Sequence, residues 1–338
     1  MDRYSRQVLF AELGSEGQRR IRASHVLIVG CGALGSLQAE MLARAGVGAL
    51  RIADRDFVEE SNLQRQTLFT ERDARERVPK AVACVARLRE INSEVEVEGR
   101  VLDVNQTNIE DLIRDCDLVL DGTDNFLTRY LINDACVKQA IPWIYGAAVG
   151  SYGVTMTVRP HETPCLRCLF PEMPAPGSAP TCDTAGIIMP AVATVVAVQV
   201  AEALKLLTGN VEDLHGAFMQ FDLWRNEWRS IKLGEPSPEC PACASARFPA
   251  LEAETGNYAT VLCGRQAVQV TPINRGRLNL AQLFERFSAV GEAQANQYLI
   301  RLRVDGYELT VFEDGRAIIR GTEDLVQAQT LYARYVGS

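Results

Sequence analysis

A glycine-rich turn near the N-terminus is the first feature that could bind a ligand. Gly30, Gly32 and Gly35 follow the apolar run at 25–29 and open a helical pattern. The first glycine permits a tight turn, the second lets a ligand approach the backbone, and the third lets helix and strand pack closely. Asp54 ends the next apolar run, near the spacing of ~20 residues at which an acid takes ribose hydroxyls. The pattern favours an adenine nucleotide over a purely structural turn, and by itself it does not distinguish NAD from ATP.

Polar residues that could hold phosphates come next along the chain. Residues 61–66 read Ser-Asn-Leu-Gln-Arg-Gln, which places Arg65 just past the ribose acid, and Lys80 begins a predicted helix. Asp121 and Asp124 lie in a loop that follows the apolar run at 118–120, and ligands of open parallel sheets bind at such strand ends. A triphosphate needs cations and a carboxylate to hold Mg²⁺, whereas a hydride-transfer site needs neither. Each charge alone could be a solvated surface group, but their order favours ATP.

The histidines give little support to a histidine-centred base. There are three, at positions 25, 161 and 215, and they form no cluster in the sequence. Nucleotidyl transfer to a carboxylate needs no strong base, because that nucleophile is already an anion at neutral pH. Such chemistry depends on positioning and charge stabilisation.

Two Cys-x-x-Cys pairs suggest a metal site. Cys165, Cys168, Cys240 and Cys243 supply the four thiolates of a structural tetrahedral zinc site. The pairs lie farther apart than in compact zinc ribbons, so spacing alone leaves open two unrelated pairs, one of them redox-active. Cys182 differs, because it stands without a neighbouring cysteine in the Pro-, Gly-, Ser- and Thr-rich stretch 171–186. The remaining cysteines are expected to pack as small apolar groups: Cys31, Cys84, Cys116, Cys136 and Cys263.

Composition indicates a soluble globular protein. The chain has 338 residues, 47% hydrophobic and 23% charged, and a formal net charge of −8, which argues against nucleic acid as a partner. The start of the chain carries no apolar run typical of a secretory signal, and with this cysteine usage we expect a cytoplasmic protein. The most apolar stretch, 187–207, is interrupted by polar residues such as Glu202. It therefore predicts a buried helix, and no membrane partner is expected.

The order of elements predicts an α/β fold. Strand, glycine turn, helix and strand over 25–54 form a βαβ unit that opens a parallel sheet. Later helices are expected at 80–91 and 127–139, and antiparallel strands at 154–158, 218–223 and 228–233. We expect a Rossmann-like, mostly parallel sheet extended by antiparallel strands over residues 1–250. Residues 258–338 read as strand, helix, three strands, helix, with hairpin turns at Asp305-Gly306 and Asp314-Gly315, which predicts a small α+β domain of unknown role.

These residues, in this order, resemble the ThiF/MoeB/HesA family of adenylyltransferases, bacterial relatives of ubiquitin-activating enzymes. The resemblance covers about residues 1–250, and Ala33 departs mildly from it because the family often has glycine there. The elements that carry it are Arg3-Tyr4-x-Arg6-Gln7, the turn at 30–35, Asp54-x-Asp56, the run 61–66, Lys80, Asp121-x-Thr-Asp-Asn125, both cysteine pairs, and Thr181-Cys182-x-x-Ala-Gly186.

The resemblance implies a role for each site residue. The turn residues Gly30, Gly32, Ala33 and Gly35 would lie against the nucleotide, with Asp54 on the ribose, Ser61, Asn62, Arg65 and Lys80 toward the phosphates, Asp124 on Mg²⁺ and Asn125 on the nucleotide. Arg6 would reach into the site of a second copy, which implies a homodimer. The paired cysteines would hold Zn²⁺. Cys182 would take the acyl group of the substrate or join in persulfide exchange.

The family's activity supplies the functional expectation. The C-terminal Gly-Gly carboxylate of a small ubiquitin-like sulfur carrier attacks the α-phosphate of ATP, pyrophosphate leaves, and a sulfur donor such as a cysteine desulfurase or rhodanese-like protein then allows a thiocarboxylate to form. Because no rhodanese domain follows the core, we favour slightly a ThiS-like carrier of thiazole and thiamine biosynthesis over a MoaD-like carrier of molybdopterin biosynthesis. Alternatives of other classes are an NAD-dependent oxidoreductase, a tRNA-modifying dehydratase and a binding scaffold with a decayed site.

Overall fold

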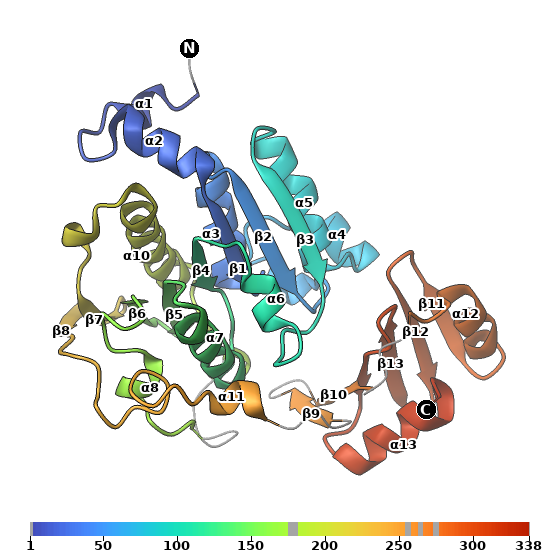
Figure 1. Ribbon diagram of the computed structural model, residues 1–338. Coiled ribbons are helices and arrows are strands. Elements are labelled where there is room, and N and C mark those ends of the chain that lie inside the picture. The colour runs from blue at the N-terminus through green and yellow to red at the C-terminus, as the bar shows by residue number, and fades with distance from the viewer. Residues whose placement is uncertain (1–2, 175–181, 254–257, 263–265, 273–276, 338) are drawn as a thin grey trace. The chain divides into compact units, whose positions relative to one another are not determined.

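The computed structural model describes residues 3–174, 182–253, 258–262, 266–272 and 277–337. Figure 1 shows its elements. The chain divides into two compact units, Met1–Ala253 and Glu254–Ser338. Each unit has its own hydrophobic core.

The first unit is built on an eight-stranded sheet of order β3-β2-β1-β4-β5-β6-β7-β8. The five strands from β3 to β5 run parallel, and β6, β7 and β8 continue the sheet antiparallel. This confirms the predicted fold class. The strands are β1 (His25–Val29), β2 (Ala49–Asp54), β3 (Glu96–Val101), β4 (Leu118–Asp121), β5 (Trp143–Val149), β6 (Tyr152–Val158), β7 (Ala217–Asp222) and β8 (Glu227–Lys232).

Helices cover both faces of the parallel part. Alternate residues of β1 point to opposite sides, so Val26 and Ile28 belong to one core cluster and Leu27 and Val29 to the other. The first cluster is closed by α3 (Ala33–Ala45), α5 (Lys80–Ile91) and α10 (Met189–Thr208), and the second by α6 (Ile109–Ile113) and α7 (Phe126–Gln139). The other helices of this unit are α1 (Ser5–Val8), α2 (Gly14–Ala23), η1 (Glu60–Asn62), α4 (Glu71–Glu76), α8 (Leu166–Leu169), α9 (Cys182–Ala185), η2 (Val211–Asp213) and α11 (Pro249–Glu252).

Helix α10 is a core helix, as its interrupted apolar pattern predicts. Among the described residues it is long and apolar enough to pass a test for a membrane span. Four of its five valines are nevertheless packed into the first core cluster. Glu202 is 1% exposed, and its carboxylate accepts a hydrogen bond from Thr157 on β6 at 3.0 Å. A buried carboxylate with a partner on the sheet fits the interior of this unit and not a lipid-facing surface.

The strand order reverses between β1 and β4, and the turns that follow these two strands therefore lie side by side. Gly30, after β1, has a φ of +87°, a conformation that favours glycine. A Cβ on Gly35 would lie 1.8 Å from the Gly30 carbonyl oxygen, and one on Gly122, after β4, would lie 2.5 Å from the same atom. The two turns are thus in backbone contact at the position where open α/β sheets bind their ligands.

The second unit is a six-stranded antiparallel sheet of order β11-β12-β13-β14-β10-β9, with α12 (Leu280–Ser288) and α13 (Leu325–Tyr335) packed in its core. The two predicted hairpin turns are present, and Asp305 and Gly306 both have positive φ, as a two-residue hairpin turn requires. The strands are β9 (Tyr258–Leu262), β10 (Ala267–Thr271), β11 (Glu292–Ala295), β12 (Leu299–Val304), β13 (Tyr307–Phe312) and β14 (Ala317–Arg320).

The predicted order of elements in this unit is wrong in its number of strands. Within the described residues of this unit, two strands, not one, precede α12, and four, not three, follow it. The additional strand after the helix is β11, whose sequence Glu-Ala-Gln-Ala has no β-branched or aromatic residue. Its pairing with β12 at the edge of the sheet, and not its own composition, makes it a strand.

Substitution of Gly35 by alanine should destabilise the first unit. A Cβ there would overlap the Gly30 carbonyl, and we expect a loss of at least ~1–3 kcal/mol in the free energy of unfolding, as for other overpacked sites. Gly32→Ala is the matched control, because no atom outside its own neighbours lies closer than 3.9 Å to a Cβ at that position. Urea unfolding of both variants checks this, and equal stabilities would contradict the close packing of Gly35 against Gly30.

Candidate active site

The carboxylate of Asp54 is fixed at the end of β2 by two backbone groups. The N–H of Cys31, inside the glycine turn, donates to its Oδ2 at 2.6 Å, and the N–H of Asp56 donates to its Oδ1 at 2.7 Å. Asp54 is buried, and burial raises the pKa of its carboxyl group, a rise opposed by Lys80 and by the two N–H donors. The glycine turn and the predicted ribose acid are therefore joined directly.

Lys80 lies at the same edge of the sheet with its charge buried. Its side chain is 5% exposed, and its Nζ lies 3.5 Å from Oδ2 of Asp56. The N–H of Lys80 also donates to the Asp56 carbonyl at 2.9 Å, which fixes the first residue of α5 beside the end of β2. An ammonium group this deeply buried requires a nearby negative charge, and Asp56 supplies it.

The segment 61–66 is brought over the glycine turn by its last residue. Gln66 is buried, and its Nε2 lies 3.9 Å from the position of a Cβ at Gly32. Asn62 is also buried and accepts a hydrogen bond from the N–H of Glu59 at 3.0 Å, which caps η1. Arg65 donates to the carbonyl of Ser61 at 2.7 Å, so its guanidinium is folded back on its own segment, and Ser61 is exposed.

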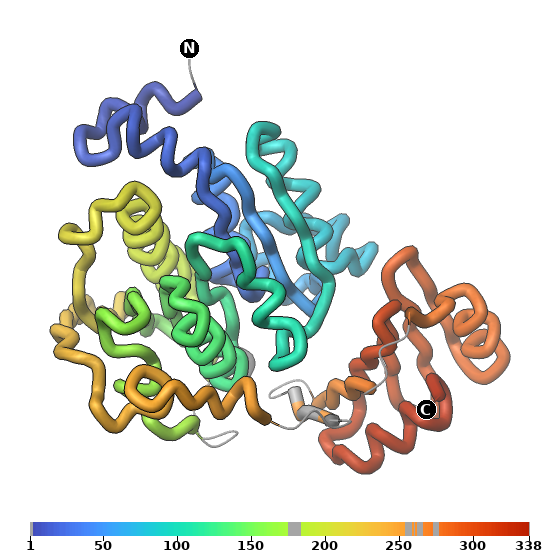
Figure 2. Tube along the Cα trace, in the orientation of Figure 1, coloured from blue at the N-terminus to red at the C-terminus, as the bar shows by residue number. Residues whose placement is uncertain are grey.

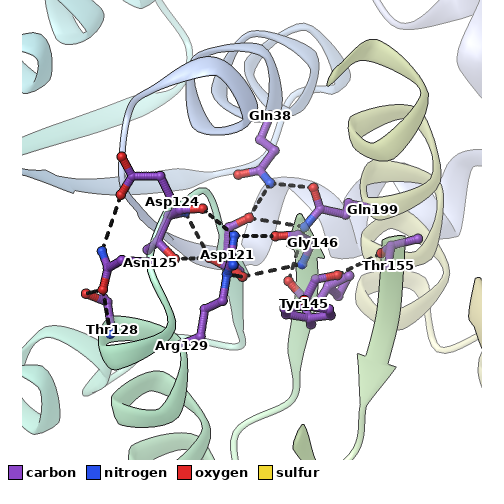
Figure 3. A network of polar contacts seen from close by, with 12 residues as sticks. Gln38, Asp121, Asp124, Asn125, Thr128, Arg129, Tyr145, Gly146, Thr155 and Gln199 are labelled. Carbon is purple, nitrogen blue, oxygen red and sulfur yellow. Dashed lines mark hydrogen bonds and ion pairs between the residues drawn. The ribbon is translucent and has the colours of Figure 1, made fainter. Parts of the chain in front are cut away.

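The two aspartates after β4 have different surroundings. Asp121 is fully buried and bonded to Arg129, whereas Asp124 is exposed at the tip of the loop (Figure 3). Asn125 donates to Oδ1 of Asp124 at 3.3 Å, and its own Oδ1 caps α7 by accepting the N–H of Thr128 at 2.9 Å. The carboxylate of Asp121 therefore stabilises the fold. Asp124 is the aspartate of this pair whose carboxylate solvent can reach.

Arg6 lies at the opposite end of the sheet from these residues. It is exposed on α1, and its neighbour Gln7 donates to the carbonyl of Ala45, at the end of α3, at 2.9 Å. The glycine turn stands at the beginning of the same 13-residue helix, roughly 20 Å away along its axis. Figure 1 shows α1 and α2 at the end where β1 starts. Arg6 is thus not brought together with the other predicted site residues of its own chain.

The four paired cysteines form one cluster. Their Sγ atoms all lie within 4.8 Å of one another, with Cys165 3.7 Å from Cys240 and 3.9 Å from Cys168, and Cys168 3.8 Å from Cys243. Thiolates around a tetrahedral zinc ion, at about 2.3 Å from the metal, would be roughly 3.8 Å apart, so the cluster is compatible with zinc. Figure 2 shows the segment before α11 returning to the region of α8 to complete it.

Comparisons with known proteins agree with this architecture. The model of the ThiF family matches residues 4–242. The chain belongs to the ThiF family. It is 49% identical over 337 residues to the sulfur carrier protein ThiS adenylyltransferase of Bacillus subtilis, covering 99% of each chain. It is 39% identical over 252 residues to the SAMP-activating enzyme E1 of Haloferax volcanii, covering 75% of this chain and 92% of that enzyme.

A solved structure shows the same fold at lower identity. The crystal structure of E. coli MccB with MccA-N7isoASN superposes with a TM-score of 0.64 at 24% identity, covering 72% of this chain and 74% of that one. This ThiF-family chain therefore shares the sheet architecture of an enzyme whose sequence has diverged widely from it.

Four further cysteines of this ThiF-family chain lie in its interior. Cys31, Cys84, Cys116 and Cys136 are buried, as predicted. Burial raises the pKa of the Cys116 thiol to about 11. Cys182 begins the short helix α9, but its side chain lies outside the described part of the chain, as does Cys263.

Several residues of the site were not predicted from the sequence. Arg55 follows Asp54 and donates to Oδ1 of Asp103 at 3.1 Å, and Asp103 lies just beyond β3. Arg129, Gln38 and Gln199 surround Asp121 from three helices. Spacing within one element gives no signal for them, because they meet only across the sheet. The one usable sign is a charged or amide side chain inside an otherwise apolar helical pattern, as at Gln199.

Replacement of one cluster cysteine should release the metal that we expect there. In Cys240→Ser, bound zinc per chain should fall well below one, and the melting temperature should drop because 234–253 loses its attachment to α8. Cys136→Ser is the matched control for zinc content, since Cys136 is a buried cysteine of α7 that is not one of the four in the cluster. Elemental analysis and calorimetry check this. Full zinc content in Cys240→Ser would contradict the assignment.

Proposed function

We propose that this chain is an ATP-dependent adenylyltransferase that activates the C-terminal Gly-Gly carboxylate of a ThiS-like, ubiquitin-like sulfur carrier. Similarity to a ThiS adenylyltransferase along 99% of both chains supports the reaction and the carrier class. The single structural observation that carries the proposal is the meeting of the glycine turn, Asp54, Lys80 and the exposed Asp124 at the strand-order reversal. A nicotinamide cofactor would leave the buried Lys80 and its partner unexplained.

In the proposed reaction, the nucleotide lies along the edge of the sheet. The carboxylate of Asp54 accepts hydrogen bonds from the ribose hydroxyls. The backbone at 30–35 lies against the phosphates, where the start of α3 offers N–H groups to an anion. Asn62, Arg65 and Lys80 stabilise the phosphate charge, for which the Arg65 guanidinium must turn from the Ser61 carbonyl. Asp124 holds Mg²⁺, which neutralises phosphate oxygens when bound, and Asn125 contacts the nucleotide.

The chemical step needs no base from the protein. The carrier's terminal carboxylate is already ionised at neutral pH and attacks the α-phosphorus, the bond to the pyrophosphate oxygen breaks, and an acyl-adenylate remains. The enzyme contributes alignment of the two anions and cationic groups where charge accumulates. A reaction that needs charge stabilisation but no base fits a site that contains buried cations and no histidine.

The remaining assignments complete the proposal. Arg6 is supplied by a second copy in a homodimer, because its own site lies at the other end of α3. The cysteine cluster holds Zn²⁺ as a structural metal. Cys182 receives the activated acyl group or sulfur, with a cysteine desulfurase or a rhodanese-like protein as donor. We assign the chemistry to residues 1–250, treat 258–338 as a separate domain, and place the protein in the cytoplasm.

Carrier dependence tests the reaction itself. With ATP and Mg²⁺, pyrophosphate should be released when a ThiS-like protein ending in Gly-Gly is present, and far less with a MoaD-like carrier or with a ThiS-like carrier lacking the last glycine. A preference for the MoaD-like carrier would correct the carrier assignment. Pyrophosphate release that never depends on any carrier would refute the function.

Loss of the buried cation should slow the reaction strongly without unfolding the chain. In Lys80→Met we expect carrier-dependent pyrophosphate release to fall by ~10²–10³-fold, the usual effect of removing one preorganised group that stabilises transition-state charge. Lys138→Met is the matched control, because Lys138 is an exposed lysine on α7 paired with Glu110. If both variants kept normal rates, Lys80 would have no role in the chemistry.

A further inference from the structure

Arg129, on the first turns of α7, is a buried cation that the proposed reaction does not use directly. Its Nε lies 3.1 Å from Oδ2 of Asp121, and the two side chains are 7% and 0% exposed. Its Nη2 donates to the carbonyl of Thr123 at 2.7 Å. Figure 3 shows the guanidinium between the end of β4, the loop 122–125 and the neighbouring strand β5. One side chain therefore bonds both the residue before this loop and a residue within it.

Asp121 in turn holds the loop with its other oxygen. Its Oδ1 accepts the N–H of Thr123 at 2.8 Å and the Thr123 hydroxyl at 2.7 Å. The N–H, the carbonyl and the hydroxyl of Thr123 are thus all engaged by the Asp121–Arg129 pair. Asp124 is the next residue along the chain, so the direction in which its backbone leaves is set by this pair.

Two buried amides fix the base of the loop from the opposite face of the sheet. Gln38 on α3 and Gln199 on α10 donate to the carbonyl of Asp121 at 2.9 and 3.2 Å, and Gln38 also donates to Gln199 at 2.7 Å (Figure 3). The N–H of Gly122 donates to the carbonyl of Val29 at 2.9 Å, which ties the loop to β1. Hydrogen bonds therefore hold the loop in place relative to the glycine turn as well as to α7.

The chemistry of this position requires arginine. The guanidinium uses Nε for a carboxylate and Nη2 for a carbonyl at the same time, and its planar donors point in fixed directions. Lysine keeps the charge that neutralises Asp121 but presents a single ammonium group. Replacement by lysine therefore separates charge compensation from the geometry of the loop.

We propose that Arg129 is a positioning residue for adenylation: through Asp121 and Thr123 it fixes the backbone from which Asp124 reaches the magnesium ion of Mg-ATP. This inference rests on the proposed function. It assigns to Arg129 no contact with the substrate, and its effect is transmitted through the loop 122–125.

The test compares Arg129→Lys with Arg51→Lys. Arg51 is bonded in the same manner, with Nε on Oε2 of Glu98 at 2.7 Å and Nη1 on the carbonyl of Leu112 at 2.7 Å, but it lies on β2 among contacts remote from the loop. In Arg129→Lys we expect kcat for carrier adenylation to fall roughly 10–100-fold, as for a misplaced catalytic group. The Mg²⁺ concentration for half-maximal rate should rise, while the KM for ATP changes little. Amides of 122–125 should exchange hydrogen faster. Arg51→Lys should match the wild type in all four measurements.

The outcomes separate this inference from the function on which it rests. A wild type without carrier-dependent pyrophosphate release refutes the proposed function, and the positioning role falls with it. An active wild type with Arg129→Lys equal to Arg51→Lys in kcat and Mg²⁺ dependence overturns the positioning role alone. If Arg129→Lys does not fold, Thr123→Val removes the hydroxyl bond to Asp121 and should move the same quantities in the same direction by smaller amounts, and unchanged kinetics in that variant would overturn the proposal.

Discussion

The active-site edge of this protein depends on backbone segments that touch without side chains between them. The reversal of strand order between β1 and β4 places two turns next to each other, and Gly30, Gly35 and Gly122 let them approach within contact distance. A ligand that binds over this point meets backbone N–H groups and the start of a helix, which suit an anion. Charged side chains stand around this point, with Asp54 and Lys80 buried and Asp124 exposed.

Charge around this point is balanced in pairs before any substrate is present. Lys80 is compensated by Asp56, and Arg129 by Asp121, in surroundings where an unpaired charge would be costly. Burial raises the pKa of the Asp121 carboxyl, and Arg129 together with the bonds from Thr123 opposes that rise. The pair with Asp56 keeps Lys80 oriented, so binding of a polyanion need not order this cation first. Such preorganisation is how a site without a strong base can still accelerate acyl-adenylate formation.

The residues that could be predicted from the sequence are those that belong to short-range sequence patterns. The glycine turn, its acid and the helix that begins at Lys80 were predicted from short-range patterns, and α5 has the predicted bounds of 80–91. The cluster of four cysteines also needed only residue type and pairing, with the family resemblance, to be proposed. Arg129, Gln38 and Gln199 were missed because each looks like an ordinary helical residue, and only the packing of α3, α7 and α10 around β4 brings them to Asp121. The short strand β11 was missed for a related reason, since its pairing partner defines it.

Helix α7 links the site to the cysteine cluster through side chains spaced four residues apart. Asn125 and Arg129 hold the loop 122–125 at one end of the helix. Tyr130 donates to the carbonyl of Phe170 at 2.7 Å, and Asp134 accepts from Arg167, between the first two cluster cysteines, at 2.6 Å and from the N–H of Ala250 at 2.9 Å. One rigid element thus carries the contacts of both regions on neighbouring faces.

Because Asp134 is fully buried and bonded to segments on either side of the cluster, a metal there would stabilise the packing of the helix that positions the loop. This arrangement explains why residues as distant in the sequence as 134, 167 and 250 belong to the same compact unit as the glycine turn.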